Sequence, residues 1–577
     1  MAKENYTGKP VARALLMFLA CGAFCAPASL VGAEWNFPSG TNCNLRVPHD
    51  AALNFPDGFK ATVRFACDLD KIGKKSRFAN LVTKGCDFND GWSIMVKNDG
   101  QLLVNLNGVQ PAYGLVGTRI ESNREHLLEV YVCTNCVRVI LDGQETGSYW
   151  YAGRRDMGKA RTPLQIGNMG GYKFAGRLFS VRLDPLSDVT LPPGGLKPIS
   201  YQPPKQQTRA EIKWVKPICV EKDRYIGWPT VCRLANGDIL AVFSGDRDGH
   251  ICPWGKVQMV RSTDDGETWS APVTIANGIL DDRDAGVVQL PDGEIVVTWF
   301  TSVAYRMPGI LAKHPEYRRH DEKLDPEAVK AAMGYFLIRS RDNGKTWSKP
   351  EKLANCEQTP HGPIVLKDGS LLQIGRRTAI ANASATGRYR RTIITVSRST
   401  DAGRTWTVLC PEIPDRDGEN SKPFMFHEPH VVELADGTLV GMVRYHGDDG
   451  GKGLAKDGNG YMRQTVSTDG GKTWTPMAKT DMLGLPPHLI RLADGKLVCV
   501  YGRRLANPGF GEFAAISDDG GKTWDVANEI SLAPSYCGDL GYPASCVLAN
   551  GDILTVFYQS PGLGENQCLM ATRWRVK

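Results

Sequence analysis

The sequence predicts an all-β protein in which a β-sandwich of the jelly-roll type precedes a six-bladed β-propeller. An Asp-Gly or Asn-Gly turn recurs six times in the C-terminal part, an eight-residue motif recurs there five times, and alternating apolar strands fill the N-terminal part. With 577 residues the chain has room for two or three domains. We predict a signal peptide over 1–33, the sandwich over 34–190, a linker over 191–213 and the propeller over 214–577.

The first segment has the pattern of a secretory signal peptide. Three basic residues precede an apolar run over 14–31, and Val31-Gly32-Ala33 provides small residues for cleavage after Ala33. We therefore expect an exported protein that is secreted, periplasmic or held at the cell surface. A membrane anchor is disfavoured because Gly, Pro and Ser interrupt the run, and a lipoprotein with Cys21 as acceptor fits the usual pattern less well. We expect no integral membrane span after cleavage.

Composition and charge exclude several classes of protein. Hydrophobic residues make up 42% and charged residues 23%, as in a soluble globular protein. The formal net charge is +7, and the predicted signal peptide carries +2 of it, which leaves +5. This charge permits attraction to anionic sugars but is too small and dispersed to predict a nucleic-acid partner.

Cysteine usage indicates no metal centre or other cofactor. Of 16 cysteines, Cys21 and Cys25 lie in the signal peptide, so 14 remain in the exported chain, and their pairing cannot be deduced from the sequence. Cys133 and Cys136 form a lone CxxC without a second pair at zinc spacing. We interpret it as a turn, bridged or reduced.

The segment from Trp35 to Pro185 alternates short strands with turns, as in 59–65 and 137–143. The stretches 127–147 and 164–178 resemble laminin-G and concanavalin-like lectin modules. This lectin-like resemblance implies glycan binding, and a purely structural accessory sandwich is the alternative. A proline-rich stretch follows and is predicted to be the linker.

Two repeats organise the remainder of the chain. The turn glycines, each between two apolar strands, are Gly237, Gly293, Gly369, Gly437, Gly495 and Gly551. The motif Ser-x-Asp-x-Gly-x-Thr-Trp occupies 262–269, 340–347, 399–406, 467–474 and 517–524. We expect its Asp to accept hydrogen bonds from its own turn, its Gly to take a positive φ and its Trp to pack against the blade.

These five copies match the Asp box, also called the BNR repeat, of the sialidase superfamily, which the chain resembles over about 214–577. The resemblance implies six blades with the motif between the outer strands of a blade. The motif also occurs in propellers that only bind, so it identifies the fold better than the chemistry.

Residues on either side of each turn glycine should return to one mouth of the propeller. Nine residues before the glycines lie Trp228, Asp284, Pro360, Glu428, Pro486 and Tyr542, and seven residues after them lie Ser244, Phe300, Arg376, Arg444, Gly502 and Tyr558. A tyrosine beside a glutamate suits a substrate with a carboxylate at the anomeric carbon. A neutral phenol can approach that carboxylate and lose its proton to the glutamate as it attacks.

The resemblance to sialidases implies particular roles for this mouth. Tyr542 would be the nucleophile, Glu428 its base, and Arg444 a ligand of the substrate carboxylate. The family's first arginine belongs to an Arg-Ile-Pro motif, but Gly227-Trp228-Pro229 stands here, so that arginine is missing. The candidate replacements for it and for the family's third arginine are Arg224, Arg376, Arg503 and Arg504. Glu512 occupies the position at which the family's third arginine is expected.

The proton donor is expected on the loop that leaves the first blade, Gly245 to His250. We expect Asp248 to be this acid, with Asp246 and His250 as alternatives. The common sialidase pattern does not explain a second acidic cluster, 282–284. The remaining predicted substrate contacts are Asp246, Arg247, Arg283, Asp284 and His430.

These residues predict a retaining exo-α-sialidase that acts on sialylated glycans or glycoproteins. A glycosidase for another acidic sugar, either an ulosonic or a uronic acid, is the alternative favoured by the missing arginine. A non-catalytic glycan-binding propeller is the third possibility, although a lectin has no need of an activated phenol. Two insertions, 303–334 and 446–460, follow return strands and are expected at the mouth. Asp325, Pro326 and Gly334 predict a short helix in the first.

Overall fold

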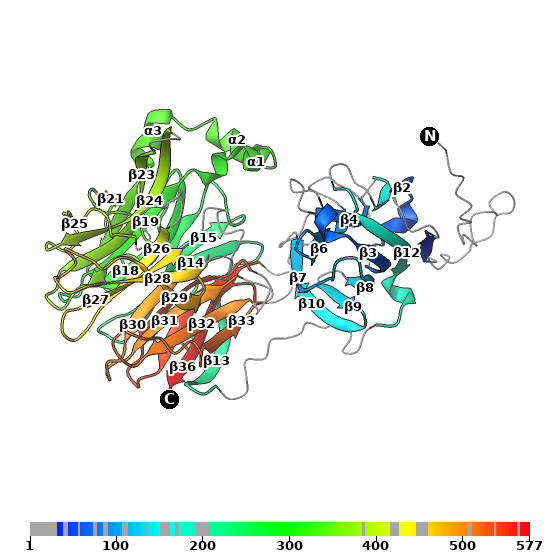
Figure 1. Ribbon diagram of the computed structural model, residues 1–577. Helices are drawn as coiled ribbons and strands as arrows, with labels where there is room; N and C mark the ends of the chain where they lie inside the picture. The colour runs from blue at the N-terminus through cyan, green and yellow to red at the C-terminus, as the bar shows by residue number, and fades with distance from the viewer. Residues whose placement is uncertain are drawn as a thin grey trace. The chain divides into compact units, whose positions relative to one another are not determined.

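The computed structural model forms two compact units, which are considered separately (Figure 1). It describes residues 32–37, 44–55, 58–72, 78–84, 91–106, 113–133, 136–150, 162–167, 172–191, 207–383, 387–415, 426–445, 460–504, 510–535, 538–561 and 566–577. Except for its last two residues, the predicted signal peptide lies outside this part. Most of the predicted linker and the insertion 446–459 lie outside it as well.

The N-terminal unit consists of two six-stranded antiparallel sheets. The first, in spatial order, contains β1 (Ala33–Asn36), β12 (Gly176–Pro185), β3 (Phe59–Cys67), β8 (Glu125–Val132), β9 (Cys136–Leu141) and β10 (Gln144–Trp150). The second contains β2 (Asn44–Val47), β11 (Leu164–Gly167), β4 (Phe78–Lys84), β5 (Trp92–Lys97), β6 (Gln101–Leu106) and β7 (Tyr113–Arg119). Short 3-10 turns are η1 (Ala51–Asn54), η2 (Leu69–Lys71) and η4 (Leu186–Asp188).

Alternation along the strands explains why these sheets stack. In β3 the buried Phe59, Val63 and Phe65 lie on one face, while Lys60 and Arg64 point away from it. The buried faces of both sheets contribute to one hydrophobic core, as expected for a sandwich. Cys133 and Cys136 form a disulfide between the end of β8 and the start of β9, so the two cysteines of the CxxC are bridged.

The C-terminal unit consists of six four-stranded antiparallel sheets. Five follow chain order: β14 (Tyr225–Arg233), β15 (Ile239–Arg247), β16 (Lys256–Ser262) and β17 (Val273–Ala276); β18 (Asp281–Gln289), β19 (Ile295–Ser302), β20 (Tyr335–Ser340) and β21 (Glu351–Lys352); β22 (Ile364–Val365), β23 (Leu371–Ala383), β24 (Gly387–Ser399) and β25 (Thr407–Cys410); β26 (Phe426–Glu433), β27 (Leu439–Tyr445), β28 (Tyr461–Ser467) and β29 (Ala478–Leu483); β30 (Pro487–Arg491), β31 (Leu497–Arg503), β32 (Gly511–Ser517) and β33 (Ile530–Pro534).

The sixth sheet joins the two ends of this unit. Its spatial order is β13 (Ala210–Cys219), β36 (Cys568–Val576), β35 (Ile553–Gln559) and β34 (Gly541–Val547), so the first strand of the unit pairs with the last. The leading strands of neighbouring sheets also contact one another, β14 with β18, β26 with β30, β30 with β34, and β34 with β14. These contacts bring the leading strands of different sheets together.

Both predicted repeats have the expected local structure. All six turn glycines have a positive φ, between 82° and 94°, and each lies between the first two strands of its chain segment. Each eight-residue motif begins at the last residue of the third strand, and its Thr donates to both oxygens of its Asp. In the motif over 399–406, the Thr405 amide donates to Asp401 Oδ1 at 2.9 Å and the Thr405 hydroxyl donates to Asp401 Oδ2 at 2.6 Å. The motif is therefore a self-capped turn, as predicted.

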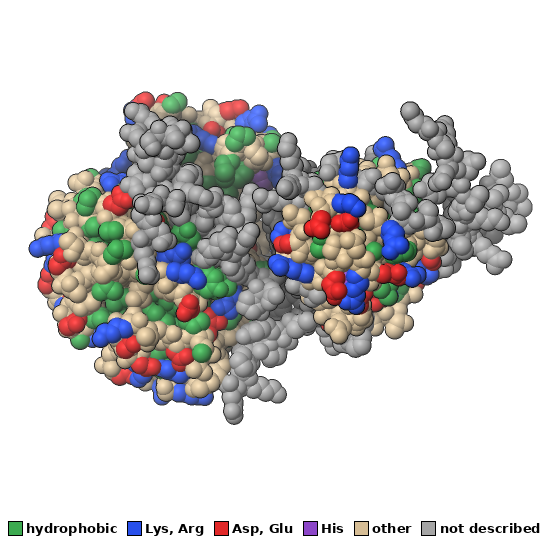
Figure 2. Space-filling view, in the orientation of Figure 1, with side chains coloured by type: hydrophobic (Ala, Val, Ile, Leu, Met, Phe, Trp, Pro, Cys, Tyr) green, Lys and Arg blue, Asp and Glu red, His purple; other side chains and the backbone are tan. Residues whose placement is uncertain are grey.

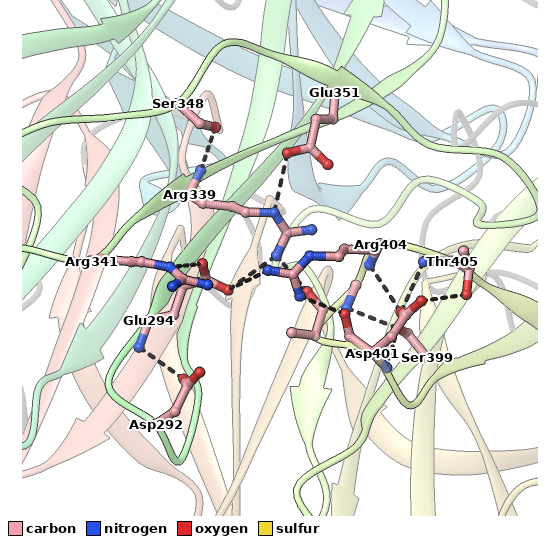
Figure 3. Close-up of polar contacts among 12 residues, drawn as sticks. Asp292, Glu294, Arg339, Arg341, Ser348, Glu351, Ser399, Asp401, Arg404 and Thr405 are labelled. Atoms are coloured by element: carbon pink, nitrogen blue, oxygen red, sulfur yellow. Dashed lines mark hydrogen bonds and ion pairs between the residues drawn. The ribbon is translucent and has the colours of Figure 1, made fainter.

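Ion pairs connect neighbouring sheets at these turns. Glu294, which is 3% exposed, pairs with Arg339 and Arg341 of its own sheet and with Arg404 of the next motif (Figure 3). Arg339 also donates to the Ala402 carbonyl at 2.6 Å. A buried carboxylate shared by three guanidiniums stabilises one relative placement of the two sheets, because breaking the set would leave a buried charge unpaired.

The insertion 303–334 is helical. It contains η5 (Ala304–Arg306), α1 (Pro308–Leu311), α2 (Pro315–Asp321) and α3 (Pro326–Ala332), grouped at one end of the unit in Figure 1. Asp325 caps α3 by accepting from the Ala328 amide, and Pro326 occupies its first turn, as predicted. Tyr305 and Tyr317 form a small core with Cys252 and Trp254, so the insertion packs on the loop between β15 and β16.

The described surface shows mixed charge. On the face shown in Figure 2, basic and acidic side chains are interspersed on each unit, without a stripe of one sign. Among the described residues, no helix is long and apolar enough to cross a membrane.

Candidate active site

Four side chains of the predicted mouth share one unusual backbone feature. Trp228, Asp284, Glu428 and Tyr542 have φ values of 57°, 53°, 42° and 53°, and each lies where its strand has one residue more than the strand it pairs with. Such bulges re-aim a side chain, and a left-handed conformation is costly for residues other than glycine. The spacing of nine residues before the turn glycine thus corresponds to a bulge in four of the six sheets.

Tyr542, Glu428 and Arg444 form a hydrogen-bonded set across two sheets. The Tyr542 hydroxyl donates to Glu428 Oε1 at 2.6 Å, and Arg444 Nη1 donates to Glu428 Oε2. Arg444 Nη1 also lies 3.5 Å from the Tyr542 oxygen, and its buried Nε has no partner among the described residues. One guanidinium therefore contacts both members of the pair and has a donor to spare.

The electrostatics of this pair hold the proton on tyrosine and the negative charge on glutamate in the resting site. Burial alone would raise the pKa of Glu428, but Arg444 and the hydrogen bonds from Tyr542 and Arg444 outweigh it and hold that pKa well below its usual range. Burial, followed by repulsion from Glu428 and Asp284, raises the pKa of Tyr542 well above its usual value. The resting site thus has a neutral phenol hydrogen-bonded to a carboxylate, and the phenol becomes nucleophilic only as it loses its proton.

The arginines divide into those near this pair and those bound elsewhere. Arg504 lies 5.7 Å from the Tyr542 ring centroid and donates to the Leu540 carbonyl at 2.8 Å and the Tyr558 hydroxyl at 3.0 Å. Arg503 instead pairs with Glu529 at 2.5 Å. Of the two neighbouring candidates, Arg504 is therefore the one at the mouth, because successive strand residues point to opposite faces.

Arg376 and Arg224 are also engaged by protein groups. Arg376 Nη1 lies 2.6 Å from Nδ1 of His427, the residue before Glu428, and so borders the site. Arg224 donates to Asp246 at 2.8 Å and to Asp248 at 2.5 Å. It is held by the acidic loop rather than beside Tyr542.

Gly227 stands where the family resemblance predicts the first arginine, and the aromatic ring of Trp228 follows it directly. Trp228 is 1% exposed, and its ring meets that of Tyr542 edge to face at 6.3 Å. Arg283 lies 3.9 Å and Arg247 4.7 Å from the Trp228 ring centroid. Arg247, fully buried, binds Asp281 through two nitrogens. A stack of two guanidiniums on an indole therefore occupies this side of the mouth.

The loop acids predicted to donate a proton are already paired. Asp248 binds Arg224, while Asp246 binds Arg224 and Lys256. His250 Nδ1 lies 3.0 Å from the Tyr225 hydroxyl and 3.1 Å from Asp539. Asp284, by contrast, is 5% exposed, and its Oδ1 has no hydrogen-bond partner among the described residues.

A histidine cluster below the bulges was not predicted. His361, His430 and His488 are nearly fully buried, with ring centroids 4.2–5.7 Å apart, and the His361 ring lies 6.4 Å from that of Tyr542. His430 Nδ1 accepts from the Leu489 amide at 3.0 Å, so its neutral ring carries the proton on Nε2 and is not arranged as a metal ligand. His430, predicted to contact substrate, thus belongs to the interior. In the part of the chain that is described, no group of three potential ligands is placed to hold a metal.

Comparison with known proteins agrees with this description. Residues 320–555 match the model of the BNR repeat-like domain. The chain is 27% identical over 273 residues to a sialidase from Paraclostridium sordellii, covering 44% of this chain and 57% of that protein. It is 27% identical over 277 residues to a sialidase from Clostridium perfringens, covering 44% and 60% respectively. The chain thus spans less than two thirds of either relative.

A solved structure from Dyadobacter fermentans, of a protein of unknown function, has a similar fold. It is 23% identical, has a TM-score of 0.50, and covers 64% of this chain and 99% of its own. With the five Asp boxes, these matches support a divergent member of the sialidase and BNR-repeat superfamily.

Proposed function

We propose that the C-terminal unit is a six-bladed β-propeller and an exo-α-sialidase that removes terminal α-linked sialic acid from glycoconjugates. Six four-stranded sheets, the pairing of β13 with β36 and the contacts between leading strands support the propeller. The observation that carries the activity is the 2.6 Å hydrogen bond from the Tyr542 hydroxyl to Glu428. A phenol paired with a carboxylate suits attack on an anomeric carbon that itself bears a carboxylate.

In the first step the Tyr542 oxygen attacks the anomeric carbon while its proton passes to Glu428. The bond to the leaving sugar breaks, and an acid of the mouth protonates the departing oxygen. Arg444 and Arg504 both lie close to Tyr542 and supply positive charge for the substrate carboxylate. Arg444 also stabilises the phenolate as it forms, because its Nη1 contacts both the Tyr542 oxygen and Glu428.

In the second step water attacks the anomeric carbon of the tyrosyl intermediate and Glu428 returns the proton to Tyr542. Two inversions at one carbon give net retention of configuration. The test is incubation with α2,3- and α2,6-sialyllactose, with free sialic acid measured by mass spectrometry and its first-formed anomer by NMR. Release of the α anomer is expected, whereas no release from a panel of sialosides would contradict the proposal.

Trp228 favours one second candidate, a glycosidase for a different acidic sugar. Gly227 stands in the place of the arginine that the family resemblance predicts, and beside it a buried indole carries two stacked guanidiniums. The carboxylate subsite therefore has another shape, which suits another ulosonic acid or a uronic acid. A parallel panel of aryl ulosonides and uronides distinguishes the two candidates, because turnover of a uronide alone would favour the second.

Two further features complete the proposal. The apolar segment over 14–31 supports export, which cell fractionation of the expressed full-length chain would test. The N-terminal sandwich, resembling lectin modules, is proposed to hold sialylated glycans near the propeller. A glycan array would be probed with the sandwich alone and with the whole chain. Binding of both to sialylated glycans only at background level, as to uncharged glycans, would contradict this role.

A further inference from the structure

The proposed reaction needs a carboxylic acid at the mouth, and two segments offer one. We propose that Asp284, on β18, is the group that protonates the leaving oxygen, in place of Asp248 on the loop after β15. This inference rests on the proposed glycosidase function and assigns a residue to the protonation of the leaving oxygen.

The backbone places Asp284 in the same position as the two reacting groups. Asp284, Glu428 and Tyr542 each occupy the bulge nine residues before a turn glycine, with φ values of 53°, 42° and 53°. Asp284 interacts electrostatically with both Glu428 and Tyr542, although it is hydrogen-bonded to neither. Strained bulges of this kind persist where a side chain has to be directed at a site.

One oxygen of the Asp284 carboxyl also lacks a protein partner among the described residues. Its Oδ1 is buried without a hydrogen-bond partner in the described part of the chain. A buried carboxyl oxygen without a partner is costly in a resting protein, and a substrate hydroxyl or glycosidic oxygen would supply the missing interaction.

Asp248 has the opposite environment. Its Oδ1 accepts from Arg224 Nη1 at 2.5 Å, and Arg224 also holds Asp246. The Arg224 guanidinium thus already occupies an oxygen of the Asp248 carboxylate, whereas Asp284 Oδ1 has no such partner among the described residues. Using Asp248 as the acid would require this pair to break during each turnover.

The groups around Asp284 keep it protonated near neutrality. Burial is the largest influence, and together with Glu428 and Asp281 it outweighs Arg283 and Arg247, raising the pKa of Asp284 to about 7. Two phenols, those of Tyr542 and Tyr335, complete the surroundings, and both are neutral because burial raises their pKa values well above neutrality. A carboxylic acid that is still partly protonated at the working pH meets the requirement for general-acid catalysis.

The step balances with the residues present. As the glycosidic bond breaks, its electron pair goes to the leaving oxygen, which takes the proton of Asp284, while Tyr542 bonds to the anomeric carbon and its proton goes to Glu428. In the second half the Asp284 carboxylate takes a proton from water as the water oxygen attacks. As the bond from the water oxygen forms, the bond to Tyr542 breaks, its electron pair goes to the phenol oxygen, and Glu428 returns the proton to that oxygen.

The decisive experiment compares leaving groups. Asp284→Asn keeps the shape and tolerates a positive φ, so the bulge is retained. A sugar leaving group needs protonation, whereas a nitrophenolate leaves without it. We expect kcat/KM of Asp284→Asn to fall by at least ~100-fold on sialyllactose and by less than ~10-fold on a nitrophenyl sialoside. The decline of wild-type kcat/KM above a pH of about 7 should disappear in the variant.

Asp248→Asn is the matched control and should lower both rates by similar factors. A selective loss on sialyllactose in Asp248→Asn would overturn the inference. An equal rise in KM for both substrates in Asp284→Asn, with kcat unchanged, would also overturn it, because Asp284 would then be a binding residue only. Failure of the wild-type protein to cleave any sialoside or related glycoside would instead defeat the proposed function.

Discussion

The buried histidine cluster makes stability depend on pH in a way that one substitution can expose. Burial lowers the pKa of His361 from 6.5 to about 3, so its ring stays neutral in the folded protein over a range where the unfolded chain binds a proton. The unfolded state then holds more protons, and the contribution of His361 to stability is lost as the pH falls below 6.5. The cost approaches about 1.4 kcal/mol per pH unit once the pH lies well below 6.5, where the unfolded ring is fully protonated.

The wild-type slope alone does not isolate this effect. Burial raises the pKa of Asp282 and of Asp284 to about 7 and that of Glu512 to about 8, so these carboxyls add stability as the pH falls and oppose the histidines. The useful quantity is the difference between the wild type and His361→Phe, which keeps a ring between His430 and Tyr542 but does not titrate.

Between pH 6.5 and 5.0 this difference should change by about 2 kcal/mol, with the wild type losing stability relative to the variant as the pH falls. Urea unfolding followed by tryptophan fluorescence at four pH values would measure it. Parallel curves for the two proteins across this window would refute the reasoning, because they would mean that His361 binds a proton as readily when folded as when unfolded.

Three further predictions concern the reaction. Tyr542→Phe should lower kcat by at least ~100-fold on a good sialoside with an unchanged circular dichroism spectrum, because it removes only the attacking oxygen, and retention of more than about a tenth of the rate would exclude Tyr542 as nucleophile. Arg444→Lys keeps the charge but loses the planar fork, so calorimetry with a sialic acid transition-state analogue should show ~10- to 100-fold weaker binding, and unchanged affinity would remove Arg444 from the site. Replacing 303–334 by a short Gly-Ser loop should change the rate on a branched glycan more than on an aryl sialoside, since the insertion packs on the loop between β15 and β16. Equal changes in the two rates would show that the insertion does not contact the aglycone.

Local rules account for what was predictable about this fold. The Asp boxes and the turn glycines are self-contained, because an Asp that binds its own turn and a Gly with positive φ require only residues within the motif. The fixed spacing from each turn also located Glu428, Arg444 and Tyr542, since two paired strands carry residues at equal distances from the turn to the same end.

Features that depend on several sheets were not predictable. Choosing Arg504 over Arg503 depends on which face of β31 meets Tyr542, and the pairing of Asp248 with Arg224 depends on how a loop folds back. The cluster around His361 brings together three sheets whose residues are far apart in sequence.

The sequence by itself thus determined the all-β architecture, the six turns, the five motifs and the position of the tyrosine–glutamate pair, because each follows from short-range periodicity and turn chemistry. Only the tertiary structure decided which carboxyl is unpaired and which guanidinium is available at the mouth. Burial and pairing set the charge state of a group, and both depend on neighbours contributed by other sheets. For Asp284 and Asp248 the residue type is the same, and the surroundings alone leave an oxygen of Asp284 without a partner among the described residues and pair Asp248 with Arg224.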